Sequence, residues 1–193
     1  SKLGLKVDYK NSLAKIYTEV LKDKCHIYNK KIYGYSGLPV SSSGKVLCLL
    51  SGGIDSPVAS WLMMKRGCKV DFLHVHSFRT NEEALKSKIG NLVKVLNDYQ
   101  FDSKLFLLPY HVYQFERMEG SDKGDLVLFR HYLLKLAEAL AEENKYGAIV
   151  TGDNLGQVAS QTIENMRASG HGISLPIFRP LLTYDKDEIV KIA

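Results

Sequence analysis

Short apolar runs alternate with longer amphipathic stretches from residue 46 to the end of the chain. Four runs of strand-like composition lie at 46–50, 69–76, 104–108 and 146–151. The first is continuously apolar, as in a strand that is buried on both faces. A short extended piece between two prolines follows at 176–180. These runs predict the strands of one sheet.

Apolar residues recur every three or four positions between these runs, which is the spacing of one helical face. The predicted helices cover 57–66, 81–99, 125–144, 155–168 and 186–193. Strands that alternate with helices imply βαβ units, and hence an α/β fold with a doubly wound, mostly parallel sheet. In such sheets ligands bind at the carboxyl ends of the strands, so the residues that follow each strand are the first candidates for a site.

The N-terminal part has a different pattern. Two runs rich in Ile, Tyr, Val and Thr flank a Lys-Asp-Lys turn at 22–24 and predict a β-hairpin, followed by a loop rich in Gly, Ser and Pro. We therefore divide the chain into a strand-rich N-terminal extension (1–33), a linker (34–45) and an α/β domain (46–193). Because an isolated hairpin is marginally stable in water, we expect the extension to complete a larger unit, in this chain or in a second copy within a homodimer.

Composition narrows the class of protein. The formal net charge is +5, and the three cysteines lack C-x-x-C spacing. No apolar run approaches the roughly 18 residues that a membrane helix needs. Disulfide scaffolds and zinc sites are therefore disfavoured, and a cytoplasmic protein that does not bind a membrane is predicted. The basic balance suits a polyanionic partner, although a Lys-rich surface is also compatible with solubility alone.

The segment S-G-G-I-D-S at 51–56 joins the first strand of the domain to its first helix. Gly52 and Gly53 let backbone N–H groups approach an anion closely, and the serines add hydroxyl donors. Pro57 fits the first turn of a helix whose N-terminus favours negative charge. The segment is neither a Walker A motif nor a dinucleotide fingerprint. An isolated S-G-G also suits an ordinary strand-to-helix turn, but the full segment predicts a phosphate cradle.

Asp55 is the informative residue of this loop. A carboxylate beside a phosphate site repels the ligand unless a cation intervenes. Its presence therefore predicts either Mg²⁺ coordination or a direct catalytic role.

A second polar segment, T-G-D-N-L-G-Q-V-A-S-Q-T at 151–162, also follows a strand. Gly152 permits close backbone approach. Asn154, Gln157 and Gln161 are three and four residues apart, so their amides are predicted to share one face of a turn and to bind neutral groups such as ribose or base edges. The alternative is a polar helix start that Asp153 caps.

Both segments together resemble a known family. S-G-G-x-D-S is the signature of the PP-loop ATP pyrophosphatases, whose fold is that of the adenine-nucleotide alpha hydrolases. The second segment resembles the tRNA 4-thiouridine synthetases, also called tRNA sulfurtransferases or ThiI-type proteins. Further matches run in the same order from about residue 34 to the end: G-L-P-V at 37–40, S-G-K at 43–45, S-P-V-A at 56–59, M-K-R-G-C at 64–68 and F-R-P-L-L at 178–182.

The resemblance implies site residues. Asp55 and Lys186 match positions that are important for activity, with Asp55 also the implied metal ligand; a solvated surface lysine is the alternative for Lys186. The implied ATP-binding residues are Leu49, Leu50, Ser51, Gly52, Gly53, Asp55, Ser56, His74, Val75, Arg130, Gly152 and Gln161. Residues 1–33 resemble only the last strands of the RNA-binding THUMP domain of the family.

The resemblance also implies an activity. ATP with Mg²⁺ would adenylate O4 of a tRNA uridine, position 8, and release pyrophosphate before sulfur from a persulfide-carrying protein or sulfide gives 4-thiouridine. Cys48 and Cys68 do not match the position of the family's relay cysteine. Cys25 and Cys68 are the alternative sulfur-carrying thiols, and the sulfur donor is not identified. The alternatives are another PP-loop adenylating enzyme and a non-catalytic ATP- or RNA-binding fragment. A role in thiamine biosynthesis is not inferred.

Overall fold

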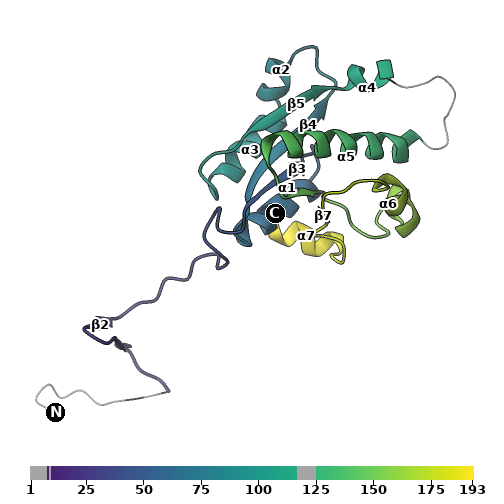
Figure 1. Cartoon of the computed structure of the whole chain (residues 1–193). Coiled ribbons are helices and arrows are strands. Elements are labelled where there is room, and N and C mark those ends of the chain that lie inside the picture. Colours follow the sequence, from purple (N-terminus) through teal and green to yellow (C-terminus); the bar gives the residue numbers. More distant parts are fainter. Residues whose placement is uncertain (1–7, 9, 117–124) are drawn as a thin grey trace, which may run out of the picture. The chain divides into compact units, whose positions relative to one another are not determined.

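The computed structural model describes residues 8, 10–116 and 125–193 (Figure 1). The chain divides into two compact units, Ser1–Ser36 and Gly37–Ala193. The first contains a hairpin and the second contains a five-stranded sheet with its helices.

The predicted N-terminal hairpin is present, and its strands are shorter than their sequence runs. Strands β1 (Tyr17–Val20) and β2 (Cys25–Tyr28) pair in antiparallel register. Tyr17 lies opposite Tyr28, with the ring centroids 5.4 Å apart, and the Lys31 ammonium lies over both rings. This aromatic pair with a cation above it is the main side-chain packing of the hairpin.

The sheet of the second unit confirms the predicted α/β, doubly wound, parallel architecture. Its strand order is β5-β4-β3-β6-β7, and every pairing within it is parallel. Its strands are β3 (Lys45–Leu49), β4 (Lys69–His76), β5 (Leu105–Pro109), β6 (Ala148–Val150) and β7 (Ile177–Phe178).

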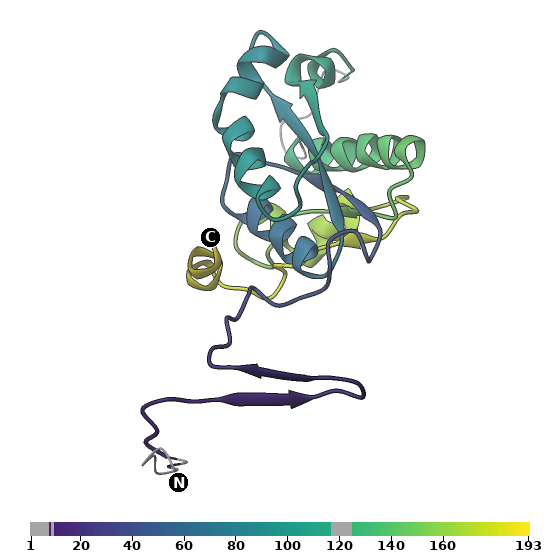
Figure 2. The ribbon, with the colours of Figure 1, turned by 90° about the vertical axis from the view of Figure 1, so that its left-hand side faces the viewer.

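Helices cover both faces of this sheet. Their bounds are α1 (Asp55–Lys65), α2 (Asn81–Lys86), α3 (Lys88–Asn97), α4 (Tyr110–Glu116), α5 (Asp125–Asn144), α6 (Ile163–Ser169) and α7 (Lys186–Ile192), with a 3₁₀ turn at Ala159–Gln161. Figure 2 shows α3 (teal) and α5 (green) on opposite sides of the sheet. Within the described residues, no helix is long and apolar enough to cross a membrane.

Strand β3 explains the two-sided core. Val46 and Cys48 point to the face that α1, α3 and α7 cover, whereas Leu47 points to the face that α5 covers. Because successive side chains of a strand alternate, a continuously apolar strand can fill two cores at once. All three side chains are buried.

Two helix predictions are wrong in detail. The stretch 81–99 forms two helices, because the backbone of Ser87 is extended and its hydroxyl accepts from Ile89 N at the start of α3. The stretch 155–168 begins as a turn, since Gly156 has φ +76° and Val158 is extended, and α6 starts only at Ile163. Helix α4 follows Pro109 directly and was not predicted.

Candidate functional site

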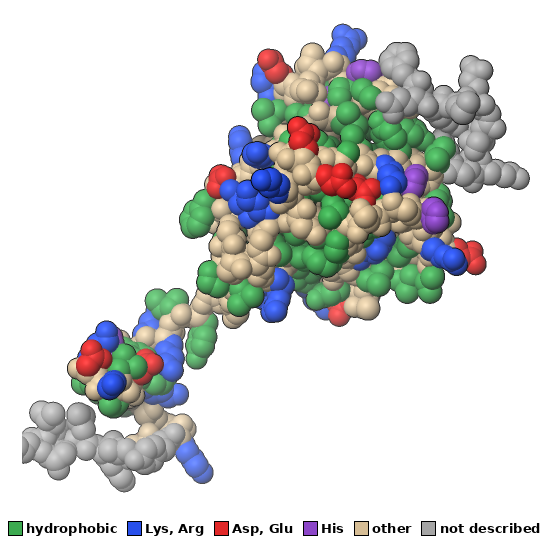
Figure 3. Space-filling view, viewed as in Figure 1, with side chains coloured by type: hydrophobic (Ala, Val, Ile, Leu, Met, Phe, Trp, Pro, Cys, Tyr) green, Lys and Arg blue, Asp and Glu red, His purple; other side chains and the backbone are tan. Residues whose placement is uncertain are grey.

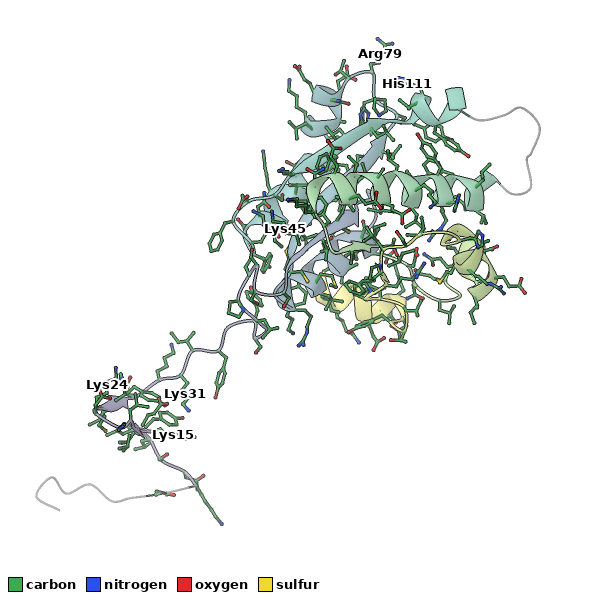
Figure 4. The ribbon with its side chains drawn as sticks, in the orientation of Figure 1. Lys15, Lys24, Lys31, Lys45, Arg79 and His111 are labelled. Carbon is green, nitrogen blue, oxygen red and sulfur yellow. The ribbon has the colours of Figure 1, made fainter. Side chains whose placement is uncertain are left out.

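The candidate residues gather at the carboxyl end of the sheet, where α/β folds bind ligands. In Figure 4, Lys45 marks the amino end of β3, and Arg79 and His111 mark the opposite end, after β4 and β5. The loop 51–54 follows β3 at this end, and the segment that begins at Thr151 follows β6 beside it.

The loop between β3 and α1 is held in shape by its own serines. Ser51 N donates to Ser56 Oγ at 2.8 Å, and the two hydroxyl oxygens are 3.0 Å apart. Gly53 N donates weakly to Ser51 Oγ at 3.3 Å. Helix α1 begins at Asp55, and the N-cap residue Ile54 supplies no side-chain acceptor. No side-chain cap therefore competes with an anion at this end of the helix.

Asp55 and Lys186 form an ion pair across 131 positions of sequence, with Nζ to Oδ1 at 2.8 Å. Asp185 begins α7 with a reciprocal capping box to Glu188. The cap sets the start of the helix, and so places Lys186 opposite Asp55. The fold thus brings the two predicted catalytic residues together.

Gly152 allows the end of β6 to pass close to the start of α1. A Cβ at this position would lie 2.7 Å from Ser56 N and 2.9 Å from the carbonyl carbon of Asp55. Both neighbours are backbone atoms and cannot move aside independently. Only glycine permits this approach, as its predicted role required.

Asp153 is buried and holds two arginines. Its carboxylate accepts from Arg130, from Arg179 Nε at 3.2 Å and from Thr151 Oγ1 at 2.9 Å. The alternative in which Asp153 caps a helix is wrong, since Thr162 caps α6 instead. The carboxylate fixes Arg130 where that side chain faces the loop's cavity. Sequence reasoning did not single out Arg179.

Two adjoining cavities open beside the loop. The smaller, of about 230 Å³, is lined by Leu49, Ser51, Asp55, Ser56, Arg130, Leu133, Leu134, Thr151, Gly152, Asp153 and Gln161. The larger, of about 400 Å³, is lined by Leu49, Leu50, Ser51, Gly52, Leu73, His74, Val75, His76, Ser77, Tyr110, Phe129 and Leu133. The shared residues Leu49, Ser51 and Leu133 make them neighbours. In the smaller cavity, Arg130 Nε and Gln161 Oε1 are buried without a hydrogen-bond partner among the described residues.

His74 presents a neutral acceptor to the larger cavity. Its Nδ1 lies 2.8 Å from Leu50 O. A carbonyl only accepts, so Nδ1 carries the proton. Burial lowers the pKa of His74, the bond to Leu50 opposes that shift, and nearby His76 adds to it. The imidazole is therefore neutral near pH 7, with Nε2 left as an acceptor.

All predicted site residues lie at one place on the chain's second unit. Most line one of the two cavities; Gly53 stays within the loop, and Lys186 reaches the smaller cavity through Asp55. The three amides at 154, 157 and 161 do not share one face, which corrects the prediction. Gln161 lines the smaller cavity, whereas Asn154 and Gln157 line a separate one.

Sequence reasoning also missed Lys88 and an aromatic wall. Lys88 Nζ donates to Gly52 O at 2.8 Å, from the first residue of α3. Tyr110 and Phe129 line the larger cavity with their ring centroids 5.4 Å apart. No local motif marks either feature, because both depend on how α3, α4 and α5 pack around the sheet.

Basic and acidic side chains are mixed on the face of the chain that Figure 3 shows, where Lys and Arg lie interspersed with Asp and Glu. In the basic cluster at 65–69, Lys69 pairs with Asp102 at 2.7 Å, and the Lys65 ammonium lies over the Trp61 ring. On this face, charge alone therefore does not locate a nucleic-acid interface.

The cysteines differ sharply in access. Cys48 is fully buried in β3, where burial raises the pKa of its thiol to about 12 despite a hydrogen bond from Ser60. Burial also raises the pKa of Cys68, whereas Cys25 is exposed on the hairpin. Only thiolates are good sulfur nucleophiles, so neither buried cysteine suits a sulfur carrier.

The rate of thiol labelling should be higher for the exposed Cys25 than for the buried Cys48. At pH 8 and in native buffer, we expect iodoacetamide to modify Cys25 readily and Cys48 at least about a thousandfold more slowly, because a raised pKa leaves little thiolate. Peptide mass spectrometry over a time course measures both rates, and labelling in urea is the control for intrinsic reactivity. Equal native rates for the two cysteines would contradict the buried position of Cys48.

Comparison with known proteins places this site in a family. Residues 41–193 match the sequence profile described as thiamine biosynthesis protein (ThiI). A probable tRNA sulfurtransferase of Methanocaldococcus jannaschii is 43% identical over 202 residues, covering 100% of this chain and 51% of the relative. Another, of Alkaliphilus metalliredigens, is 40% identical over 98% of this chain and 48% of its own length. The chain thus spans about half the length of these relatives.

Solved structures agree with the sequence matches. A 4-thiouridine synthetase, in a complex with RNA and bound ATP, superposes with a TM-score of 0.87 at 37% identity, over 97% of this chain and 49% of that one. The U34-tRNA thiolase NcsA of Methanococcus maripaludis shares the fold, with a TM-score of 0.55 at 18% identity, over 80% of this chain and 56% of that one. Since the profile match takes in every strand and helix that builds the site, the chain belongs to the ThiI family.

Proposed function

We propose that the chain is the ATP-using part of a tRNA sulfurtransferase that makes 4-thiouridine. The observation that carries the proposal is the Asp55–Lys186 ion pair, which lies beside the S-G-G-I-D-S loop and its two cavities. An acid and a mobile cation at a phosphate-type loop suit the transfer of an adenylyl group. The similar 4-thiouridine synthetase, solved with RNA and ATP, supports both substrates.

The two cavities suit the two ends of ATP. The larger is mainly apolar, with an aromatic wall, and offers the neutral Nε2 of His74 as an acceptor, which fits a purine ring. The smaller opens onto the loop and the α1 N-terminus, where backbone N–H groups favour phosphate oxygens. Arg130, held by Asp153, adds a fixed positive charge there.

In the proposed reaction, O4 of a tRNA uridine attacks the α-phosphate of ATP and pyrophosphate leaves. The loop and the N-terminus of α1 stabilise the charge that develops on the pyrophosphate. Lys186, released from Asp55, neutralises charge on the reacting phosphate. Sulfide then adds at C4 of the uridine and loses its protons, and AMP departs with the original oxygen. A persulfide R–S–SH would instead give a C4–S–S–R linkage, and a second thiol would have to cleave this linkage to leave 4-thiouridine and a disulfide. The chain's own share is to position the substrates and to compensate their charge.

Mg²⁺ fits this site through Asp55. The carboxylate is partly exposed, lines the smaller cavity and is a hard oxygen donor. The described residues contain no group of three or more His, Cys, Asp or Glu side chains that would hold a metal alone. One carboxylate together with substrate phosphates is the usual way in which proteins bind Mg²⁺. The ion would supply charge neutralisation for the phosphates.

The product of the reaction tests the proposal. Purified protein incubated with unmodified tRNA, ATP, Mg²⁺ and sulfide should yield 4-thiouridine, measured by mass spectrometry of nucleosides after digestion of the RNA. Omitting ATP or sulfide should abolish the product, and ADP should not replace ATP. Thiolation without ATP, or ATP turnover that ignores tRNA and sulfide, would refute it.

Lys88 should bind the β- and γ-phosphates. In the ligand-free chain it donates to Gly52 O, so its ammonium already lies at the loop where these phosphates would sit. We expect Lys88→Ala to raise the Kd for ATP and the inhibition constant for inorganic pyrophosphate by about tenfold or more, the usual loss for a hydrogen bond to a charged group. AMP binding should change little.

Lys86→Ala is the matched control for Lys88, since it removes an exposed lysine from the neighbouring helix α2. Isothermal titration calorimetry with ATP, AMP and pyrophosphate measures all three affinities. Equal affinities in the two variants would show that Lys88 does not contact the phosphates.

A further inference from the structure

A third cavity lies beyond the Asp55–Lys186 ion pair. It has a volume of about 500 Å³ and is lined by residues 154–157 and 182–186. Lys186 belongs to this lining, whereas Asp55 lines the smaller cavity proposed for phosphate, and their charged atoms are 2.8 Å apart. The ion pair therefore separates the proposed ATP site from the third cavity, which ATP does not occupy in the proposed reaction.

Hydrogen bonds between the two lining segments fix the shape of this third cavity. Leu155 N donates to Leu182 O at 3.1 Å, and the buried side-chain amide of Asn154 donates to Tyr184 O. Gly156, with φ +76°, donates to Gln161 O at 2.9 Å and turns the chain back toward the sheet. The two walls are thus joined to each other, and the cavity is a built feature of the fold.

The lining suits a flat, neutral ring with a polar edge. Leu155 and Leu182 provide apolar surface, and the side chain of Leu155 is 45% exposed. Gln157 is exposed and carries both a donor and an acceptor, the complement of an imide edge with its N–H and carbonyl groups. The carboxylate of Asp185 is engaged at 2.8 Å by Glu188 N, so its charge is partly compensated.

The side-chain amides of Gln157 and Gln161 lie in different cavities, which also supports a separate ligand for the third cavity. Gln161 reaches the smaller cavity proposed for ATP, whereas Gln157, four residues earlier, lines the third cavity. The intervening 3₁₀ turn sends the two side chains to opposite sides of the ion pair. One segment of chain therefore serves two binding spaces, and adenylation needs two substrates that meet at one phosphate.

We propose that the third cavity receives the acceptor base, a pyrimidine nucleotide flipped out of the RNA, with Gln157 reading its imide edge. This inference rests on the proposed function. A base that remains in a stack cannot present its C4 oxygen to a buried phosphate, so enzymes that modify bases take them out of the helix. A base between Leu155 and Leu182 would point this oxygen toward Lys186, beside the place where the α-phosphate arrives.

Photo-crosslinking tests the location directly. An unmodified tRNA that carries a single 5-iodouridine at the acceptor position is irradiated with the purified protein and ATP, and the cross-linked peptides are identified by mass spectrometry. We expect cross-links within 154–157 or 182–186. Cross-links confined to the cavity around His74 and Tyr110, or to the hairpin, would overturn the inference.

Two substitutions test the role of the cavity. Leu155→Trp should obstruct the place of the base and lower RNA-dependent pyrophosphate release at least about a hundredfold. Gln157→Leu, of similar size, should lower kcat/KM for RNA by about tenfold through the loss of hydrogen bonds. The Kd for ATP should stay within about twofold in both variants, which also shows that the site remains folded. Val95→Trp, on an exposed position of α3, is the control for a bulky addition.

The outcomes separate the two proposals. If the wild-type protein releases pyrophosphate with RNA and Leu155→Trp does so equally well, the cavity does not hold the acceptor base and the proposed function stands. If the wild-type protein binds ATP but never releases pyrophosphate with RNA, the proposed function fails and the acceptor cavity fails with it.

Discussion

Replacing Asp55 with Ala is expected to lower RNA-dependent pyrophosphate release by about 10²–10³-fold, the range seen when one preorganised group that stabilises the transition state is lost. Asp55 is the first residue of α1, lines the phosphate cavity and holds Lys186 at 2.8 Å. Its removal takes away the proposed metal ligand and leaves the lysine unpositioned. Asp55→Asn should be nearly as inactive, because it keeps the shape but not the charge.

The loss of pyrophosphate release in Asp55→Ala should come from the missing carboxylate and not from unfolding of the chain. The side chains of Asp55 and Lys186 are 26% and 49% exposed, so their ion pair contributes less than about 1 kcal/mol to the free energy of unfolding. Urea denaturation should therefore show near-normal stability for Asp55→Ala. Asp98→Ala, at the far end of α3, is the control acid and should keep full turnover. Normal turnover by Asp55→Ala would remove the basis of the proposed mechanism.

Of the three aspartate variants whose stability we consider, at positions 55, 102 and 153, Asp153→Ala should lose the most, about 3–5 kcal/mol in the free energy of unfolding. The carboxylate is only 6% exposed and joins Arg130 and Arg179, which are 21% and 19% exposed. Its removal leaves two guanidinium groups partly buried without a counter-charge. Thr151 also loses its acceptor.

A surface pair gives the control for Asp153. Asp102 pairs with Lys69 but is 78% exposed, so Asp102→Ala should cost less than about 1 kcal/mol. Urea denaturation of both variants measures the difference in the free energy of unfolding, provided that this free energy falls with urea concentration at the same rate in both. If Asp153→Ala were as stable as Asp102→Ala, the arginines would not depend on this carboxylate.

The loop and its glycines were predictable because their signals are contiguous. Gly52, Gly53 and Asp55 follow a continuously apolar strand, and a strand-to-helix connection in a parallel sheet places them at its carboxyl end whatever the rest of the fold. Gly152 was predictable for the same reason, as a glycine at the end of the neighbouring strand. The sequence alone, in contrast, does not predict that Asp55 and Lys186 lie together; only the resemblance to the family named both as site residues.

The remaining features depend on contacts between distant parts of the chain. Arg179 meets Asp153 only because β7 lies beside β6, and Lys88 reaches Gly52 only because α3 starts beside the loop. The prediction of a helix over 155–168 rested on a spacing of apolar residues that is compatible with a helix. It is wrong because Gly156 adopts a left-handed conformation, which interrupts a helix.

Which bond of ATP is cleaved distinguishes adenylation of the tRNA from transfer of the terminal phosphate. With ATP labelled at the γ-phosphate, unmodified tRNA and sulfide, we expect the label in pyrophosphate, with AMP formed in equal amount and one 4-thiouridine per AMP. Both products should disappear with Asp55→Ala. Release of labelled orthophosphate with ADP, or cleavage that does not depend on tRNA, would show that the chain does not adenylate tRNA.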